Sequence, residues 1–280
     1  MTLAAVTRAE VYKLFSRSSS RAGLLMVVLL AALPPILVLA ARLGMGVWLG
    51  PDQMFNGLPV SEYFSLPGSS AQVIALRIRD FFVLKALILL LAAQIFAGEL
   101  QARTLREDVL RPVSRCSVLL AKWFALVAWI AAVSFLSWGA SAGLGLVFFG
   151  WGDAWQGPIL GLFAAVVGDA GFAAVALAAS VLTRSVAATV AGVFFLAVLD
   201  YGLDWVLWLM KMAPMIPHEY GKLAGQVAEA AYPWMPFSAF ALWRGFETGS
   251  WGWQGAITLM GMTALALVVA IGAFRRMDVP

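Results

Sequence analysis

Charged residues are scarce in this sequence, and that scarcity excludes a water-soluble globular protein. Asp, Glu, Lys and Arg make up 12% of the chain and hydrophobic residues 62%, whereas charged residues make up about 25% of a soluble domain. The apolar residues also come in long runs, which need a bilayer around them. The sequence therefore predicts a polytopic membrane protein.

Cysteine and histidine are nearly absent as well. The single cysteine, Cys116, excludes an internal disulfide and a cysteine-based metal site, and the single histidine, His218, leaves little scope for hydrolytic or metal chemistry. No segment has the form G-x-x-x-x-G-K-[ST] that cradles phosphates, so we expect no nucleotide-hydrolysing site in this chain. The net charge is +4, but the basic residues gather beside apolar runs, and nucleic acid is not an expected partner.

Apolar runs long enough to cross a bilayer recur along the chain. About 20 apolar residues cross the hydrocarbon layer of ~30 Å as a helix. We therefore expect an all-α integral membrane protein with one membrane domain over residues 1–280. In one run, Gly161, Ala164, Ala165 and Gly168 share a face, and such small residues let helices approach closely. The six predicted transmembrane helices cover residues 22–41, 81–98, 118–149, 158–182, 186–210 and 253–274.

Three further segments lie outside these spans. Residues 2–21 place apolar side chains at helical spacing opposite basic ones, which is typical of an amphipathic interfacial helix. Residues 42–79 are rich in Gly, Pro and Ser and are expected to form an extracytoplasmic segment. Residues 232–248 hold two prolines and an apolar piece too short to span, which favours a short re-entrant or interfacial segment before the last span.

A charged island between residues 98 and 115 fixes the expected orientation. Basic residues beside spans mark the cytoplasmic side of a membrane. In the predicted map, twelve of the nineteen Lys and Arg residues fall on the side of this island, together with both termini. We expect a multi-pass protein of the cell inner (cytoplasmic) membrane, with both termini and Cys116 in the cytoplasm, where thiols stay reduced.

The island also carries a recognisable pattern. It contains Glu99, then Thr104-Leu105-Arg106, Leu110, the run Arg111-Pro112-Val113-Ser114-Arg115 and Lys122. This pattern resembles the element after the second span in the membrane subunits, or permeases, of type-2 ATP-binding-cassette (ABC) exporters. In that family the element is a coupling helix that docks on a separate ATPase subunit. The resemblance therefore implies a cytoplasmic coupling helix over residues of about 100–111 here.

The resemblance further implies which residues dock and which partners they need. Charge-assisted bonds from Glu99 and Arg111 would fix the ends of the element, and Arg103 stands where the family usually has Gly. Two permeases, identical or homologous, would form the translocation pathway in the lipid bilayer. ATP and Mg would be bound by the ATPase, and no cofactor by this chain. The docking residues implied are Glu99, Arg103, Thr104, Leu105, Arg106, Glu107, Leu110, Arg111, Pro112, Ser114, Arg115 and Lys122.

Ionisable residues inside predicted spans form the second group of candidates, because charge in a bilayer is costly and usually functional. Lys85, Asp169 and Asp200 each lie roughly 21 to 23 Å from the inner end of their span at about 1.5 Å per residue, so they share one depth. We expect an ion-pair cluster that holds spans together. A role in the translocation pathway or its gating stays open as the alternative.

The favoured function is the membrane subunit of an ATP-driven exporter, not an enzyme by itself, and three alternatives stay open. A mechanical relay would pass ATPase motion to an extracytoplasmic partner. An intramembrane aspartyl protease would need two nearby carboxylates, for which Asp169 and Asp200 are available, but its Gly-x-Gly-Asp and Tyr-Asp signatures are absent. A channel would need a filter motif or a ring-forming acidic stripe, and neither is present.

Overall fold

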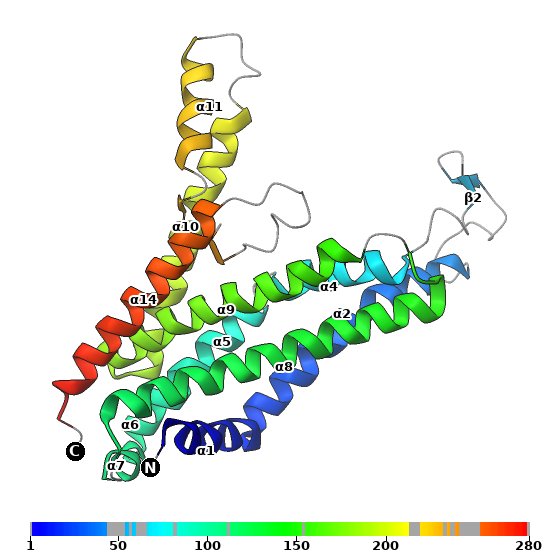
Figure 1. Ribbon diagram of the computed structural model, residues 1–280. Coiled ribbons are helices and arrows are strands. Elements are labelled where there is room, and N and C mark those ends of the chain that lie inside the picture. Colours follow the sequence, from blue (N-terminus) through cyan, green and yellow to red (C-terminus); the bar gives the residue numbers. More distant parts are fainter. Residues whose placement is uncertain are drawn as a thin grey trace.

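The computed structural model is almost wholly helical (Figure 1). It describes residues 2–43, 54–55, 58–59, 66–80, 83–110, 113–152, 155–212, 219–231, 234–235, 239–240 and 253–278. Two short strands, β1 (Met54–Phe55) and β2 (Leu58–Pro59), pair antiparallel. The helices are α1 (Leu3–Ser16), α2 (Ser18–Arg42), α4 (Gly68–Asp80), α5 (Val83–Ala93), the π-helix η1 (Gln94–Gly98), α6 (Glu99–Gln101), α7 (Leu105–Leu110), α8 (Arg115–Phe149), α9 (Gln156–Thr183), α10 (Val186–Met212), α11 (Glu219–Ala231) and α14 (Trp253–Arg275).

Within the part of the chain that the structure describes, five helices are long and apolar enough to cross a membrane. They match the first, second, third, fourth and sixth predicted spans, which confirms an all-α membrane protein. The fifth predicted span, 186–210, falls in α10, where the apolar stretch among the described residues is Val186–Leu196. The five are Ser18–Arg42, Val83–Gln101, Arg115–Phe149, Gln156–Thr183 and Trp253–Arg275.

The longest helix, α8, forms the spine of the bundle, and α1, α2, α4 and α9 all pack against it (Figure 1). Its amino-terminal half buries large apolar side chains, including Trp129 and Ile130, at 0% exposure. Its carboxyl-terminal half buries small side chains. A Cβ at Gly145 would lie 2.7 Å from Cβ of Ala71, so only glycine permits this approach of α8 to α4.

The sequence analysis did not anticipate α4, which lies in the predicted extracytoplasmic segment 42–79. The helix buries Ala71, Ala75 and Leu76 on one face, and Ser141 Oγ of α8 donates to the Ala71 carbonyl at 2.9 Å. The face is made mostly of small residues, so it gives no strong hydrophobic pattern in the sequence. Tertiary packing, and not local apolar content, explains this helix.

The predicted close-packing face on the fourth span is confirmed. Gly161, Ala164, Ala165 and Gly168 are all buried in α9. A Cβ at Gly168 would lie 2.4 Å from the carbonyl oxygen of Phe240, so a side chain there would collide with backbone. The small residues of α9 thus let it pack against α5, α8 and α14 at once.

The amino-terminal helix is shorter than predicted and is packed into the bundle. The expected interfacial helix covers 2–21, but α1 ends at Ser16, Arg17 is extended, and the next residues already belong to α2. One face of α1, with Val6, Glu10 and Leu14, is buried. Both chain termini lie at the end of the bundle that carries α1, α6 and α7 (Figure 1).

The predicted outer re-entrant segment, 232–248, lies largely outside the described residues. Of its described residues, Ala239 is 0% and Phe240 8% exposed. Their burial places part of this segment in the bundle, against α9.

Candidate functional site

The predicted coupling helix is two short helices joined by a turn. α6 ends at Gln101, residues 102–104 form the turn, and α7 begins at Leu105. Arg103 adopts the left-handed conformation, with φ of 60°, and the Thr104 amide donates to the Glu99 carbonyl at 3.0 Å. A left-handed residue ends a helix and favours glycine. A glycine at the position of Arg103 would adopt this backbone conformation without a side-chain clash.

The turn and the start of α7 form a charged surface over a buried anchor. Leu105 is 0% exposed and belongs to the main hydrophobic core. Its neighbours Arg103, Thr104, Arg106 and Glu107 are exposed. We call residues 102–107 the exposed turn. Its charged side chains face outward, and the buried side chain of Leu105 attaches it to the core.

Four predicted docking residues, Leu110, Arg111, Pro112 and Ser114, follow the exposed turn in the sequence. Arg111 and Pro112 lie outside the described residues, as does the side chain of Leu110. Ser114 caps α8, since its Oγ accepts a hydrogen bond from the Ser117 amide at 3.1 Å.

Arg115, also predicted to dock, contacts this chain's own carboxyl-terminal helix. Its Nη1 donates to the carbonyl oxygens of Phe274 at 3.1 Å and Arg275 at 3.3 Å, and to that of Met277. A cation at the end of a helix satisfies its last carbonyls and its dipole. Arg115 therefore joins α8 to the end of α14.

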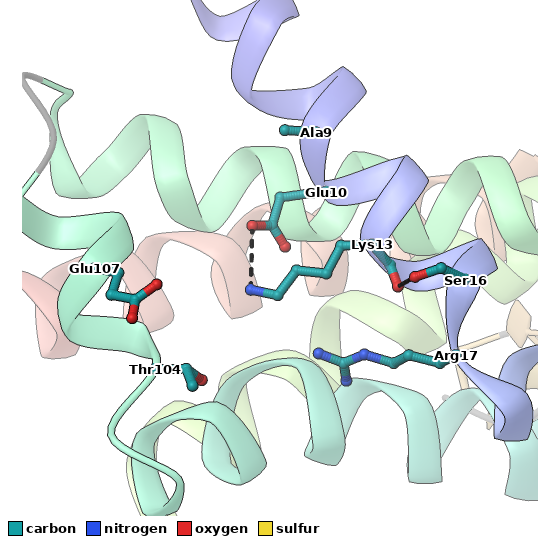
Figure 2. Close-up of a pocket in the computed structure, with 7 residues that line it drawn as sticks. All are labelled: Ala9, Glu10, Lys13, Ser16, Arg17, Thr104 and Glu107. Atoms are coloured by element: carbon teal, nitrogen blue, oxygen red, sulfur yellow. Dashed lines mark hydrogen bonds and ion pairs between the residues drawn. The ribbon is translucent and has the colours of Figure 1, made fainter.

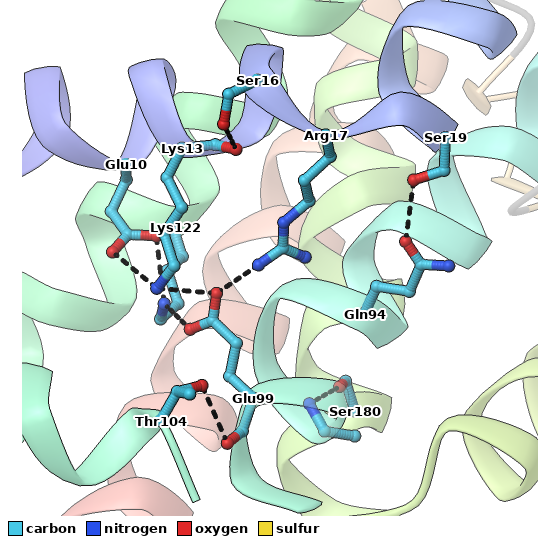
Figure 3. Close-up of polar contacts among 11 residues, drawn as sticks. Glu10, Lys13, Ser16, Arg17, Ser19, Gln94, Glu99, Thr104, Lys122 and Ser180 are labelled. Atoms are coloured by element: carbon cyan, nitrogen blue, oxygen red, sulfur yellow. Dashed lines mark hydrogen bonds and ion pairs between the residues drawn. The ribbon is translucent and has the colours of Figure 1, made fainter. Parts of the chain in front are cut away.

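Glu99 is buried behind the exposed turn, with an exposure of only 4%. Its Oε1 accepts from Lys13 Nζ at 2.8 Å and from the Arg17 guanidinium, and its Oε2 from Lys122 Nζ at 2.6 Å (Figure 3). Three cations of this chain thus surround one carboxylate.

Lys122, at 0% exposure, is the deepest charge of this group. Besides Glu99, it contacts Oε2 of Glu10 at 3.0 Å, and Glu10 Oε1 lies 3.8 Å from Lys13 Nζ. We call Glu10, Lys13, Arg17, Glu99 and Lys122 the inner cluster. Charges of this kind stay buried only when they are paired, so the cluster clamps α1, α6 and α8 together.

A cavity of about 490 Å³ opens between α1 and the exposed turn (Figure 2). Charged side chains from both walls reach it, so it connects the inner cluster with the surface. The lining residues are Ala9, Glu10, Lys13, Ser16, Arg17, Thr104 and Glu107.

Glu10, Lys13 and Arg17 belong to the site, although they are not among the residues predicted from the sequence. They recur at spacings of three and four, which places them on one face of a helix. The same pattern also fits a basic surface opposite apolar residues. Only the fold reveals that the matching carboxylate, Glu99, lies 82 positions beyond Arg17.

The second candidate group lies among the spans. Lys85 Nζ of α5 is 2.5 Å from Oδ1 of Asp169 on α9, and their side chains are 12% and 1% exposed. The rings of Phe172 and Phe240 lie 5.5 and 5.8 Å from the Lys85 ammonium, at cation–π distance. The side chain of Asp200, the third predicted member, lies outside the described residues.

One comparison with known proteins places the chain in a family. A family model described as ABC-2 family transporter protein matches residues 8–200, well over half of the chain. No curated protein matches the sequence. The matched region includes the inner cluster, the exposed turn and the Lys85–Asp169 pair, and it agrees with the resemblance found at the charged island. The chain is therefore a membrane transport subunit that belongs to the ABC-2 transporter family.

Proposed function

We propose that this chain is the transmembrane subunit of an ATP-driven exporter and that a separate ATPase subunit docks on the exposed turn. The observation that carries this proposal is the position of the turn directly over buried anchors. Leu105 is fully buried, and Glu99 binds three cations from α1, the α1–α2 junction and α8. A push on the turn would therefore move several helices together.

The geometry divides the docking residues into two roles. Arg103, Thr104, Arg106 and Glu107 are exposed and would contact the ATPase directly. The buried residues, Glu99 and Lys122, would hold the turn on the bundle without touching the partner. The ATPase would bind ATP and Mg, and this chain would bind no cofactor.

Two copies of the chain, or one copy and a homologue, would enclose the pathway. α10 would be the fifth of six spans, and its exposed Phe194, Phe195, Leu196 and Leu199 suit lipid or a second subunit. Both termini and the exposed turn would face the cytoplasm from the inner membrane. The apolar, Gly- and Ala-rich interior favours an amphiphilic, lipid-like or peptidic substrate.

The Lys85–Asp169 contact favours transport over proteolysis. An aspartyl protease needs a carboxylate that shares a proton with a second carboxylate. Asp169 instead contacts an ammonium at 2.5 Å. That charge pairing suits a structural or gating element of a transporter.

Replacing both arginines of the exposed turn tests the docking surface. Arg103→Gly keeps the left-handed backbone while removing the charge, and Arg106→Ala removes the second cation. Each charge-assisted hydrogen bond lost at an interface costs about 1.5 to 3 kcal/mol. We expect recovery of the ATPase with the tagged permease to fall at least about tenfold, at an unchanged level of permease in the membrane.

Arg184→Gly is the matched control. Arg184 is also exposed and also has a positive φ, of 55°, but it lies in the turn between α9 and α10. It should leave ATPase recovery unchanged. If the turn variant and the control recovered equal amounts of ATPase, the exposed turn would not be the docking surface.

Cys116 reports the orientation of the protein. It is the only cysteine and is partly exposed near the start of α8. A membrane-impermeant maleimide should label it in opened membranes and not in intact cells. Gln156→Cys in a Cys116→Ser background should behave in the opposite way, because Gln156 is exposed at the start of α9, which follows the end of α8 that lies away from Cys116. Labelling of Cys116 in intact cells would show that the proposed orientation in the membrane is wrong.

A further inference from the structure

The helix that carries both Lys85 and Glu99 changes its winding between them. α5 passes into the π-helix η1 (Gln94–Gly98) and then into α6, which starts at Glu99. A π-helix bonds residue i to i+5 instead of i+4, so it accommodates one residue more than an α-helix and displaces one N–H from the α-helical ladder. Single π turns of this kind are frequent at functional sites.

Side chains of the neighbouring helices hold the π-helix at both ends. The buried amide of Ala97 donates to Ser180 Oγ of α9 at 3.1 Å. At the other end, Ser19 Oγ of α2 lies 3.2 Å from Oε1 of Gln94 (Figure 3). The Ser180 hydroxyl gives the displaced N–H a partner, which stabilises the π winding at this position.

The register between α5 and α9 requires the extra residue. Two contacts join this helix to α9: Lys85 with Asp169, and Ala97 with Ser180. Both pairs advance in the same direction, so the helices are parallel. Ala97 follows Lys85 by twelve positions, whereas Ser180 follows Asp169 by only eleven. The π-helix accommodates the additional residue, so that the segment from Lys85 to Ala97 spans the same length as the segment from Asp169 to Ser180.

We propose that η1 is a two-state register element that links the exposed turn to the Lys85–Asp169 pair. In the π state, as observed, both contacts with α9 are made. In an α state, the Ala97 amide would return to the ladder and release Ser180, and α5 would shift against α6 by one residue, about 1.5 Å and 100°. One hydrogen bond of the Ala97 amide replaces another in this exchange, so the number of backbone hydrogen bonds does not oppose it.

The inner cluster gives this element its input. Glu99 begins α6 and is clamped to α1 and α8, and motion of the exposed turn reaches η1 through the three residues of α6. The output is Lys85, fourteen positions before Glu99 on the same continuous helix. The proposal rests on the proposed function, because a docked ATPase supplies the motion.

Two single-residue deletions test the register. Deletion of Ala97 removes the extra residue, so a straight α-helix would keep Lys85 on Asp169 and Glu99 in the inner cluster. Its melting temperature in detergent should stay within about 3 °C of the wild type. Deletion of Ala178, on α9 between Asp169 and Ser180, increases the mismatch to two residues. It should lower the melting temperature by at least about 10 °C or prevent folding. If both deletions lowered the melting temperature equally, the proposed register between α5 and α9 would be contradicted.

Hydrogen–deuterium exchange tests the switch in the complex with the co-purified ATPase. Adding Mg-ATP and vanadate should change the exchange rate of amides 94–98 at least about threefold in the wild type, and not in the Ala97 deletion. Ser141→Ala, which removes a buried serine hydroxyl far from η1, should respond like the wild type. An unchanged rate in the wild type, or the same response in the deletion variant, would overturn the switch. If no ATPase co-purified, the proposed function would be contradicted and the switch would have no source of motion. The two deletion variants would still test the register between the helices.

Discussion

Glu99→Gln should destabilise the protein far more than Lys122→Met, although both residues belong to the inner cluster. The cluster holds three cations and two carboxylates. Loss of the Glu99 charge leaves Lys13, Arg17 and Lys122 around the single carboxylate of Glu10. Loss of the Lys122 charge leaves two cations with two carboxylates. Breaking a buried ion pair costs about 3 to 5 kcal/mol, and we expect that cost for Glu99→Gln and less than half of it for Lys122→Met.

Thermal unfolding in detergent and the yield of membrane-inserted protein measure this difference. The double variant Glu99→Gln/Lys122→Met should recover part of the stability, because it removes one of the unpaired cations. Glu107→Gln is the matched control, since Glu107 is exposed on the turn and should leave the melting temperature unchanged. If Glu99→Gln kept full stability but lost the ATPase, Glu99 would be a docking residue after all.

This expectation differs from the one that the sequence supports by itself. The resemblance to the permeases identifies Glu99 and Lys122 as part of a docking element, and a motif records residue types and spacing but not direction. Glu99 follows a π-helix that turns it toward α1 and α8, where it is 4% exposed. The sequence places Glu99 next to a charged turn, and only the fold shows that its carboxylate contacts Lys13, Arg17 and Lys122 of the same chain.

Other parts of the fold also differ in whether the sequence alone predicts them. The spans could be predicted because runs such as 118–149 and 253–274 satisfy a length and composition requirement that depends on the bilayer alone. α4 could not be predicted, because its buried Ala71 packs against the opposing Gly145 of α8. The π-helix is a matter of register between two helices, and no local composition signals it. The depth argument placed Lys85 and Asp169 at one level, and only the fold shows which atoms meet.

The Lys85–Asp169 pair should behave as one energetic unit. Lys85→Met leaves the Asp169 carboxylate, at 1% exposure, without its observed ammonium contact, and Asp169→Asn leaves that ammonium between the rings of Phe172 and Phe240. Each single change should therefore cost about 3 to 5 kcal/mol. The double variant should cost much less than the sum, because it removes both charges and leaves neither buried alone.

A double-mutant cycle on the melting temperature measures this coupling directly, and a coupling energy of about 2 kcal/mol or more is expected for groups in contact. A parallel cycle with Asp200→Asn tests whether the third predicted residue shares the charge, since removing it would then also relieve Lys85→Met. The exposed pair Arg106→Ala and Glu107→Gln provides a surface reference, where the coupling should stay below about 0.5 kcal/mol. Strict additivity of Lys85→Met and Asp169→Asn would mean that the two charges do not stabilise each other. The proposal that η1 acts on this ion pair would then be contradicted.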